Sequence, residues 1–408
     1  MAAPAPLTDE DVKTFVTEGV LLLPLPAAAD SSAAGSELLR QCVEMAPLTG
    51  ALQSLLGCDY VMDQQTDVLS SSGGGNTGYH RDEPPRTGRL ASHKPRWVTV
   101  LLSPTASFAL DIISRSHMLY SDRDTVALDE LAASSAAFRF APTIPAGTAV
   151  LLHPRTLRRA GRQIAAGQDP PPLPVCHWLS CFRVSEPTEP TWTMDHWGEM
   201  QDSYRTSPFA KAPSPRDPWL QVIWESVYLW MRGEGAAATS LADSTAAQLA
   251  ETVLSAGNGR GLRVGSAYGL GAAARTGSDE ALQALAELLG HAEAEVRTAT
   301  VLGLSATGDD AVPLLSFMLE ECLESNSISE LTCDLLAALG EAVETPEPEV
   351  VELLVRAAER ALIREQGTDG DDGNGGGGHE EMLETAVESL GLLAEKVMAQ
   401  RDVECVGE

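Results

Sequence analysis

The sequence has few basic side chains. It holds 28 Lys and Arg against 58 Asp and Glu, which leaves a formal charge of -30 at pH 7. A chain of this charge repels phosphate backbones and anionic lipid headgroups. We therefore expect no nucleic-acid partner and no attachment to a membrane.

Paired cysteines and long apolar runs are also missing. The seven cysteines are scattered, none forms a C-x-x-C pair, and they are too sparse for a secreted disulfide scaffold. The early apolar patch at 20–23 stops at Pro24, far short of a membrane span, and no basic segment precedes it. These absences favour a reducing compartment, and we expect a cytoplasmic protein.

The length of 408 residues exceeds what one hydrophobic core usually organises, so we expect two domains. Thr8 precedes an acidic, then apolar stretch in a capping pattern, which predicts a short opening helix. Short runs rich in Val, Leu and Thr at 97–102 and 148–152 predict a β-rich barrel or sandwich. Pro, Ser and Thr from about 185 to 220 indicate a linker.

The C-terminal half predicts paired helices. Gly-Leu-Gly-Ala at 269–272, Gly-Leu-Ser-Ala at 303–306 and Ala-Leu-Gly-Glu at 338–341 recur at spacings of 34 and 35 residues. Each is followed by a turn and a second apolar helix, as in a solenoid of helix pairs, and the small residues allow close helix approach. The segment Glu-Val-Arg-Thr-Ala at 295–299 resembles part of a HEAT repeat.

These patterns give domain bounds of 1–200, a linker or interface segment at 201–235, and a repeat domain at 236–400. The Asp- and Gly-rich stretch within 367–380 interrupts the repeats. A calcium loop needs a Glu ligand at its twelfth position and flanking helices in register, whereas a disordered acidic insertion needs only this composition. We favour the insertion. The aromatic residues within 219–230 are expected where the two domains meet.

The most informative motif is His80-Arg81-Asp82. In an extended chain, residues two positions apart point to the same side, so an imidazole and a carboxylate aim at one point. Non-haem Fe(II) oxygenases combine such a pair with a distant second His, and leave positions open for a keto acid and dioxygen. A solvated surface pair is the alternative interpretation of the tripeptide alone.

Several other segments resemble the phytanoyl-CoA dioxygenase family and occur in its order. The stretches 7–23 and 55–61 are similar to its opening helix and strand and to its strand entry before the metal motif. Asp-Ile-Ile-Ser-Arg-Ser-His at 111–117 resembles its Gly-Ser-His segment, and 147–154 resembles the strand before its distal ligand. The resemblance covers about residues 7–185.

This resemblance implies an N-terminal double-stranded β-helix, also called a jelly roll or cupin-like fold, with flanking helices. Together with the repeats, it implies a two-domain protein whose second domain is an all-α HEAT-like solenoid. It also implies Fe(II) as cofactor and 2-oxoglutarate as cosubstrate, with His80 and Asp82 as metal ligands.

Two positions depart from the family pattern. Arg158 and Cys176 stand where the family has its second metal-binding His and its 2-oxoglutarate-binding Arg. An arginine stays protonated and offers only donors, so Arg158 cannot bind Fe(II) as a neutral imidazole does. His153 is the candidate replacement ligand, and Arg158 or Arg183 the candidate cosubstrate contact. His177 is either a buried structural histidine or a displaced ligand.

Two functions are therefore in competition. One is an Fe(II)- and 2-oxoglutarate-dependent dioxygenase or hydroxylase acting on an unknown small molecule. The other is a catalytically inactive relative that binds a protein partner through its HEAT-like repeats. The retained His-x-Asp pair favours the enzyme, and the third ligand decides: His153 or His177 beside the metal supports the enzyme, and Arg158 in that space opposes it.

Overall fold

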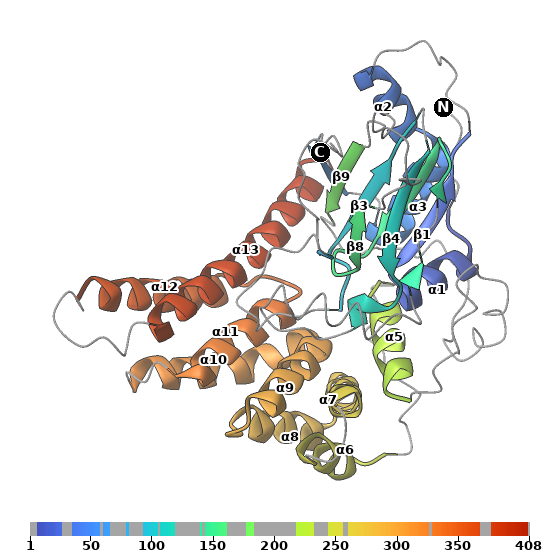
Figure 1. Ribbon diagram of the computed structural model, residues 1–408. Helices are drawn as coiled ribbons and strands as arrows, with labels where there is room; N and C mark the ends of the chain where they lie inside the picture. The colour runs from blue at the N-terminus through green and yellow to red at the C-terminus, as the bar shows by residue number, and fades with distance from the viewer. Residues whose placement is uncertain are drawn as a thin grey trace, which may run out of the picture. The chain divides into compact units, whose positions relative to one another are not determined.

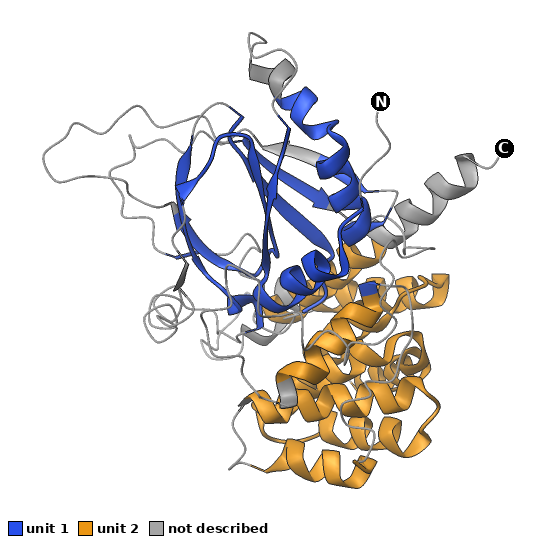
Figure 2. Ribbon diagram, turned by 90° about the vertical axis from the view of Figure 1, so that its right-hand side faces the viewer, with its two compact units in different colours: residues 1–84, 93–214, 231–233 blue, residues 85–92, 215–230, 234–408 orange. Residues whose placement is uncertain are grey.

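The chain folds into two compact units, one rich in β-strands and one helical (Figure 2). In the computed structural model the first comprises residues 1–84, 93–214 and 231–233, and the second residues 85–92, 215–230 and 234–408. The structure describes residues 6–26, 35–57, 60–65, 79–80, 93–104, 107–118, 139–140, 143–160, 177–182, 218–231, 244–255, 260–325, 329–367 and 377–406.

The first helix, α1 (Asp9–Glu18), begins at the predicted cap. The Thr8 hydroxyl accepts a hydrogen bond from the backbone N–H of Asp11, and the Asp11 carboxylate accepts one from the N–H of Thr8. The helix ends at Gly19, whose φ of 72° is left-handed. A β-carbon there would collide with the His117 ring, so both backbone and space require glycine.

One antiparallel sheet has five strands in the order β1-β7-β3-β9-β2. Two of them, β3 and β7, coincide with the strands predicted at 97–102 and 148–152. The strands are β1 (Val20–Pro24), β2 (Val61–Gln65), β3 (Trp97–Leu102), β7 (Thr148–Leu152) and β9 (His177–Phe182).

The second sheet is centred on β4 (Phe108–Ile113). On one edge of β4 lies β8 (Leu157–Ala160), and on the other lie β5 (Arg139–Phe140) and β6 (Thr143–Ile144), which share one register. The free edge of β8 forms a single antiparallel bridge with His80. His80 thus extends this sheet on the outer side of β8.

The core of the β-rich unit lies between the two sheets. Helix α3 (Ala46–Leu56) packs against β3 and β9. Alternate residues of those strands therefore point either into the core between the sheets or away from it. A short helix α2 (Gly35–Val43) and a 3₁₀ turn η1 (Ser116–Met118) are the remaining elements in the described part of this unit. The core comprises Val20, Leu101, Val150 and Leu152 from the first sheet and Phe108, Leu110, Ile112 and Ile144 from the second.

The helical unit consists largely of successive helix pairs (Figure 1). The pairs are α8 with α9, α10 with α11, and α12 with α13. Successive pairs contact each other through one row of helices, α7, α9, α11 and α13. No helix in the described ranges is both long and apolar enough to cross a membrane. The helices are α5 (Pro218–Met231), α6 (Ala246–Leu254), α7 (Arg260–Arg275), α8 (Asp279–Leu289), α9 (Ala294–Thr307), α10 (Val312–Glu324), α11 (Glu330–Ala342), α12 (Pro348–Gly367) and α13 (Gly377–Val406), with a 3₁₀ turn η5 (Gly308–Ala311).

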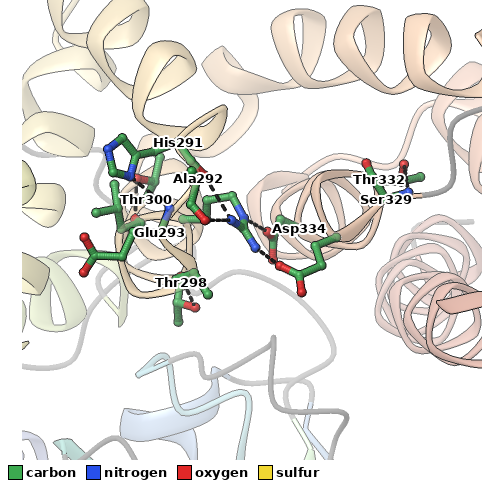
Figure 3. Close-up of polar contacts among 12 residues, drawn as sticks. His291, Ala292, Glu293, Thr298, Thr300, Ser329, Thr332 and Asp334 are labelled. Atoms are coloured by element: carbon green, nitrogen blue, oxygen red, sulfur yellow. Dashed lines mark hydrogen bonds and ion pairs between the residues drawn. The ribbon is translucent and has the colours of Figure 1, made fainter. Parts of the chain in front are cut away.

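A repeated ion pair joins successive helices of this row. Arg263 of α7 donates to Glu293 at 2.7 Å. Arg297 of α9 donates to Asp334 of α11 at 2.6 Å, and Figure 3 shows the bonds at Asp334. Both arginines are buried, and they lie 34 residues apart. A buried arginine therefore recurs with the sequence repeat, while its acidic partner lies 30 residues further along the chain in one case and 37 in the other. Arg297 also pairs with Glu330 and donates to the carbonyls of His291 and Ala292.

Glycines set the spacing between α7 and α9. A β-carbon on Gly303 would lie 2.5 Å from the carbonyl oxygen of Ala267, and one on Gly271 would collide with the carbonyl of Gly303. The backbones are thus closer than any side chain allows. This confirms that the small residues of the repeat serve close helix approach.

We expect Gly303→Ala to lower the free energy of unfolding of the helical unit by about 1–3 kcal/mol, because the added methyl overpacks the α7–α9 contact. Gly391→Ala is the matched control. It lies exposed within α13, a β-carbon there meets nothing within 4 Å, and alanine should add about 0.5–1 kcal/mol through helix propensity. Urea denaturation followed by far-UV circular dichroism measures both. Equal shifts would contradict the close approach.

Candidate functional site

His80 and Arg158 lie directly opposite each other in the second sheet. The N–H of His80 donates to the Arg158 carbonyl at 3.0 Å, and the N–H of Arg158 donates to the His80 carbonyl at 3.1 Å. Two residues paired in this way project their side chains from the same face, with Cα atoms about 5.5 Å apart. Arg158 also pairs with Ile112, a member of the core between the sheets. His80 and Arg158 therefore both face the interior.

The Arg158 side chain crosses that interior. It is 1% exposed, and its guanidinium carbon lies 4.0 Å from the ring centroid of Trp178 on β9. Trp178 pairs with Leu101 of β3 and packs against the same core. A cation over an indole in a desolvated place contributes about 2 kcal/mol. The contact holds the guanidinium between the two sheets, on the same face of the second sheet as the His80 side chain.

Neighbouring Arg159 points the other way. Its guanidinium lies 2.8 Å from the Asp111 carboxylate and 4.4 Å from the centroid of the Tyr79 ring. Asp111 is opposite Arg159 in the β4–β8 register. The side chains of Arg158 and Arg159 thus lie on opposite faces of the sheet, and of these two arginines Arg158 belongs to the candidate site.

His177 faces away from this interior. It shares its side of β9 with Leu179 and Cys181, whereas Trp178 occupies the opposite side. Burial lowers the pKa of His177 and raises that of the Cys181 thiol to about 12. His177 therefore lies on the opposite face of β9 from the side that Trp178 and the core occupy.

The predicted ligand His153 uses both ring nitrogens for other bonds. Its Nε2–H donates to the carbonyl of His93 at 3.1 Å, and its Nδ1 accepts from the N–H of Arg155 at 3.2 Å. Burial, then His117 and Arg155, hold its pKa well below the usual value. His153 is thus a neutral imidazole with no lone pair available to a metal. This bonding argues against the ligand role expected from the sequence.

The end of the segment at 111–117 is buried and makes polar contacts with helix α1. Arg115, at a left-handed φ of 67°, places its guanidinium 2.9 Å from the Glu18 carboxylate, which also accepts from Ser114. His117 donates from Nε2 to the carbonyl of Val16 at 2.9 Å. These contacts tie the end of α1 to the second sheet. Sequence reasoning missed the Glu18–Arg115 pair, since no local pattern links residues 97 positions apart.

The described residues of the inner face, His80 and Arg158, do not by themselves supply the Fe(II) ligands that the family resemblance implies. A guanidinium offers donors only, and it stands in the row of the sheet directly beside His80. At an effective dielectric of about 20, a guanidinium repels a divalent ion placed about 5 Å from it by roughly 7 kcal/mol. No cluster of three or more His, Cys, Asp or Glu suited to a metal occurs among the described residues.

Three positions of the candidate site, Asp82, Cys176 and Arg183, lie outside the described ranges, as do Arg81 of the motif and residues 368–376 of the predicted insertion. The proposed pairing of Asp82 with a metal and of Arg183 with a cosubstrate therefore stays a prediction.

Comparison with known proteins adds little beyond this geometry. No family model and no curated protein matches the chain. Among solved structures, the chain is similar to the non-heme alpha-ketoglutarate-dependent carbocyclase SnoK of nogalamycin biosynthesis. That likeness covers 45% of this chain and 88% of the carbocyclase at 13% identity, with a TM-score of 0.27.

The buried Glu18–Arg115 pair should control the stability of the β-rich unit. We expect Glu18→Gln to cost about 3–5 kcal/mol, since it leaves a buried guanidinium without its charge partner. Glu44→Gln is the control, because the Arg40–Glu44 pair is about half exposed and contributes about 0.5 kcal/mol or less. Chemical denaturation followed by tryptophan fluorescence compares them. Similar losses of unfolding free energy in both variants would contradict a stabilising role for the Glu18–Arg115 pair.

The buried His153 should make stability fall in mild acid. Its folded-state pKa is lowered, so below about pH 6.5 only the unfolded chain takes up this proton and the folded state loses stability. In His153→Gln the slope of unfolding free energy against pH between about 5 and 6.5 should be shallower by up to about 1.4 kcal/mol per pH unit. An unchanged slope would show that His153 is not buried as a neutral ring.

Proposed function

We propose that this chain is a non-catalytic relative of the phytanoyl-CoA dioxygenase-like oxygenases, which serves as a binding scaffold through its helical unit. One observation carries the proposal: the Arg158 side chain lies opposite His80, on the inner face, buried over the ring of Trp178. A cation there takes the position that the family resemblance gives to a metal ligand.

The order of the strands supports a jelly roll, or double-stranded β-helix, for the β-rich unit. Along the chain, β2 belongs to the first sheet, His80 to the second, β3 to the first and β4 to the second. After β5 and β6, strands β7, β8 and β9 alternate between the sheets in the same way. Two facing sheets that share consecutive strands are typical of jelly rolls.

The ion-pair and glycine repeats support a HEAT-like solenoid for the helical unit, since each recurs between successive helix pairs. We propose domain bounds of 1–200, 201–235 and 236–400, with the acidic insertion inside the last. A cytoplasmic location, a protein partner and the absence of a nucleic-acid partner belong to the same proposal.

Asp82 is the proposed counter-charge of Arg158. It follows His80 by two residues, so an extended backbone would bring its carboxylate to the side of the sheet that Arg158 faces. A buried guanidinium requires such a partner. The carboxylate that holds a metal in the family would then hold an arginine, and the fold would keep its interior charge balance without a metal.

An Fe(II)- and 2-oxoglutarate-dependent oxygenase acting on a small molecule is the second candidate. The inward-facing His80, as the first half of a retained His-x-Asp pair, favours it. His80 and Asp82 would then hold the metal, and Arg183 would contact the cosubstrate carboxylate. The third protein ligand would have to come from outside the described ranges.

The substitution Arg158→His separates these candidates. It restores an imidazole opposite His80, so we expect it to create Fe(II) binding that the natural protein lacks. Anaerobic titration with Fe(II) and 2-oxoglutarate would show a visible charge-transfer band in Arg158→His. The natural protein and the charge-preserving control Arg158→Lys should show none, and their melting temperatures should not respond to Fe(II).

A second change establishes where the metal binds. Adding His80→Ala to the Arg158→His variant should abolish the band. A band in the natural protein that His80→Ala removes would overturn the proposal in favour of the oxygenase. Absence of Fe(II) binding in a folded Arg158→His variant would contradict the proposed relationship to a metal site.

A further inference from the structure

The helical unit contains a long stretch without any cationic side chain. Between Arg297 and Arg356 the sequence holds 12 Asp and Glu and no Lys, Arg or His. Residues 236–408 as a whole carry 32 acidic and 9 basic side chains. Most of the negative charge of the protein is therefore concentrated in this unit.

Part of this charge forms two exposed stripes on neighbouring helices. On α10, Phe317, Glu320, Glu321 and Glu324 are exposed at helical spacing, and on α12 so are Glu352, Arg356, Glu359 and Ile363. We call these eight residues the α10–α12 face. It presents five carboxylates and one guanidinium.

The two stripes lie side by side. Arg356 pairs with Glu320 at 3.0 Å, and Arg360 donates to the carbonyl of Leu323. The partners in these contacts are 36 and 37 residues apart, so the two helices run in the same direction with a fixed offset. The only cation of the face is already paired with one of its acids.

Two large apolar side chains mark the ends of the face. Phe317 is 58% exposed and Ile363 is 71% exposed. With the offset of 36 residues, Phe317 is level with Leu353, ten residues before Ile363 on α12. Ten residues of helix span about 15 Å. The face therefore offers two apolar contacts separated by about 15 Å along the helix axes, with carboxylates between them.

We propose that the α10–α12 face docks a Lys- and Arg-rich helical segment of a partner protein. Such a segment would present two apolar side chains about eleven residues, or three helical turns, apart, against Phe317 and Ile363, and cations between them. Charge complementarity selects this occupant, because apolar anchors supply affinity while opposite charge guides the encounter. The inference rests on the scaffold role proposed above and names the class of its partner.

A second copy of this chain is a poorer occupant of the same face. Two such faces brought together would oppose five carboxylates with five, and the formal charge of -30 adds to the repulsion. The partner must supply positive charge, which this helical unit has in short supply.

The test uses the full-length protein and a synthetic fluorescein-labelled helical peptide, with two leucines about eleven residues apart and lysines between them on the same face. Fluorescence anisotropy at low salt should detect binding that weakens as salt rises. Phe317→Ser or Ile363→Ser should weaken it at least about tenfold, as for loss of an interface anchor. Val387→Ser, at a 54% exposed site on α13, is the matched control and should leave it unchanged.

Several results would overturn the proposal. These are no binding, equal effects of Phe317→Ser and Val387→Ser, or equal binding of a peptide with serines in place of its leucines. Self-association of the natural protein that Phe317→Ser abolishes would identify a second copy as the occupant. None of these measurements involves iron, so their failure is distinguishable from failure of the Arg158→His experiment.

Discussion

A positive charge buried between two sheets is the constraint around which the β-rich unit is organised. Arg158 stands in the same row as His80 and Ile112, and its guanidinium lies against Trp178 of the facing sheet. A charge so placed must be neutralised by its surroundings, because the interior does not solvate it. Any ligand chemistry at His80 has to accommodate that charge, and a divalent metal accommodates it poorly.

Local signals in the sequence predicted much of the framework. The cap at Thr8 and the Val-rich strands at 97–102 and 148–152 are encoded by neighbouring residues, and the structure confirms them. The spacing of motifs also identified Arg158 as the residue at the expected position of a metal ligand. The pairing of Arg158 with His80 across the sheet could not be predicted, because it depends on which strands lie side by side.

The remaining features depend on contacts between distant segments. The sequence offered His153 as a ligand, yet its ring nitrogens bond to backbone groups that only the folded chain brings near. Likewise, the face of β9 that carries His177 is set by the register with β3. The docking face requires the offset between α10 and α12, which no single-helix pattern contains.

The cation-free stretch from 298 to 355 also affects how the protein can be dissected. Trypsin cleaves after Lys and Arg, so it finds no bond to cut between Arg297 and Arg356. Helices α10 and α11, with most of α9 and the start of α12, would survive even complete digestion as one covalent piece. A protease specific for acidic residues would instead cut within the α10–α12 face, and protection there would report directly on its occupancy.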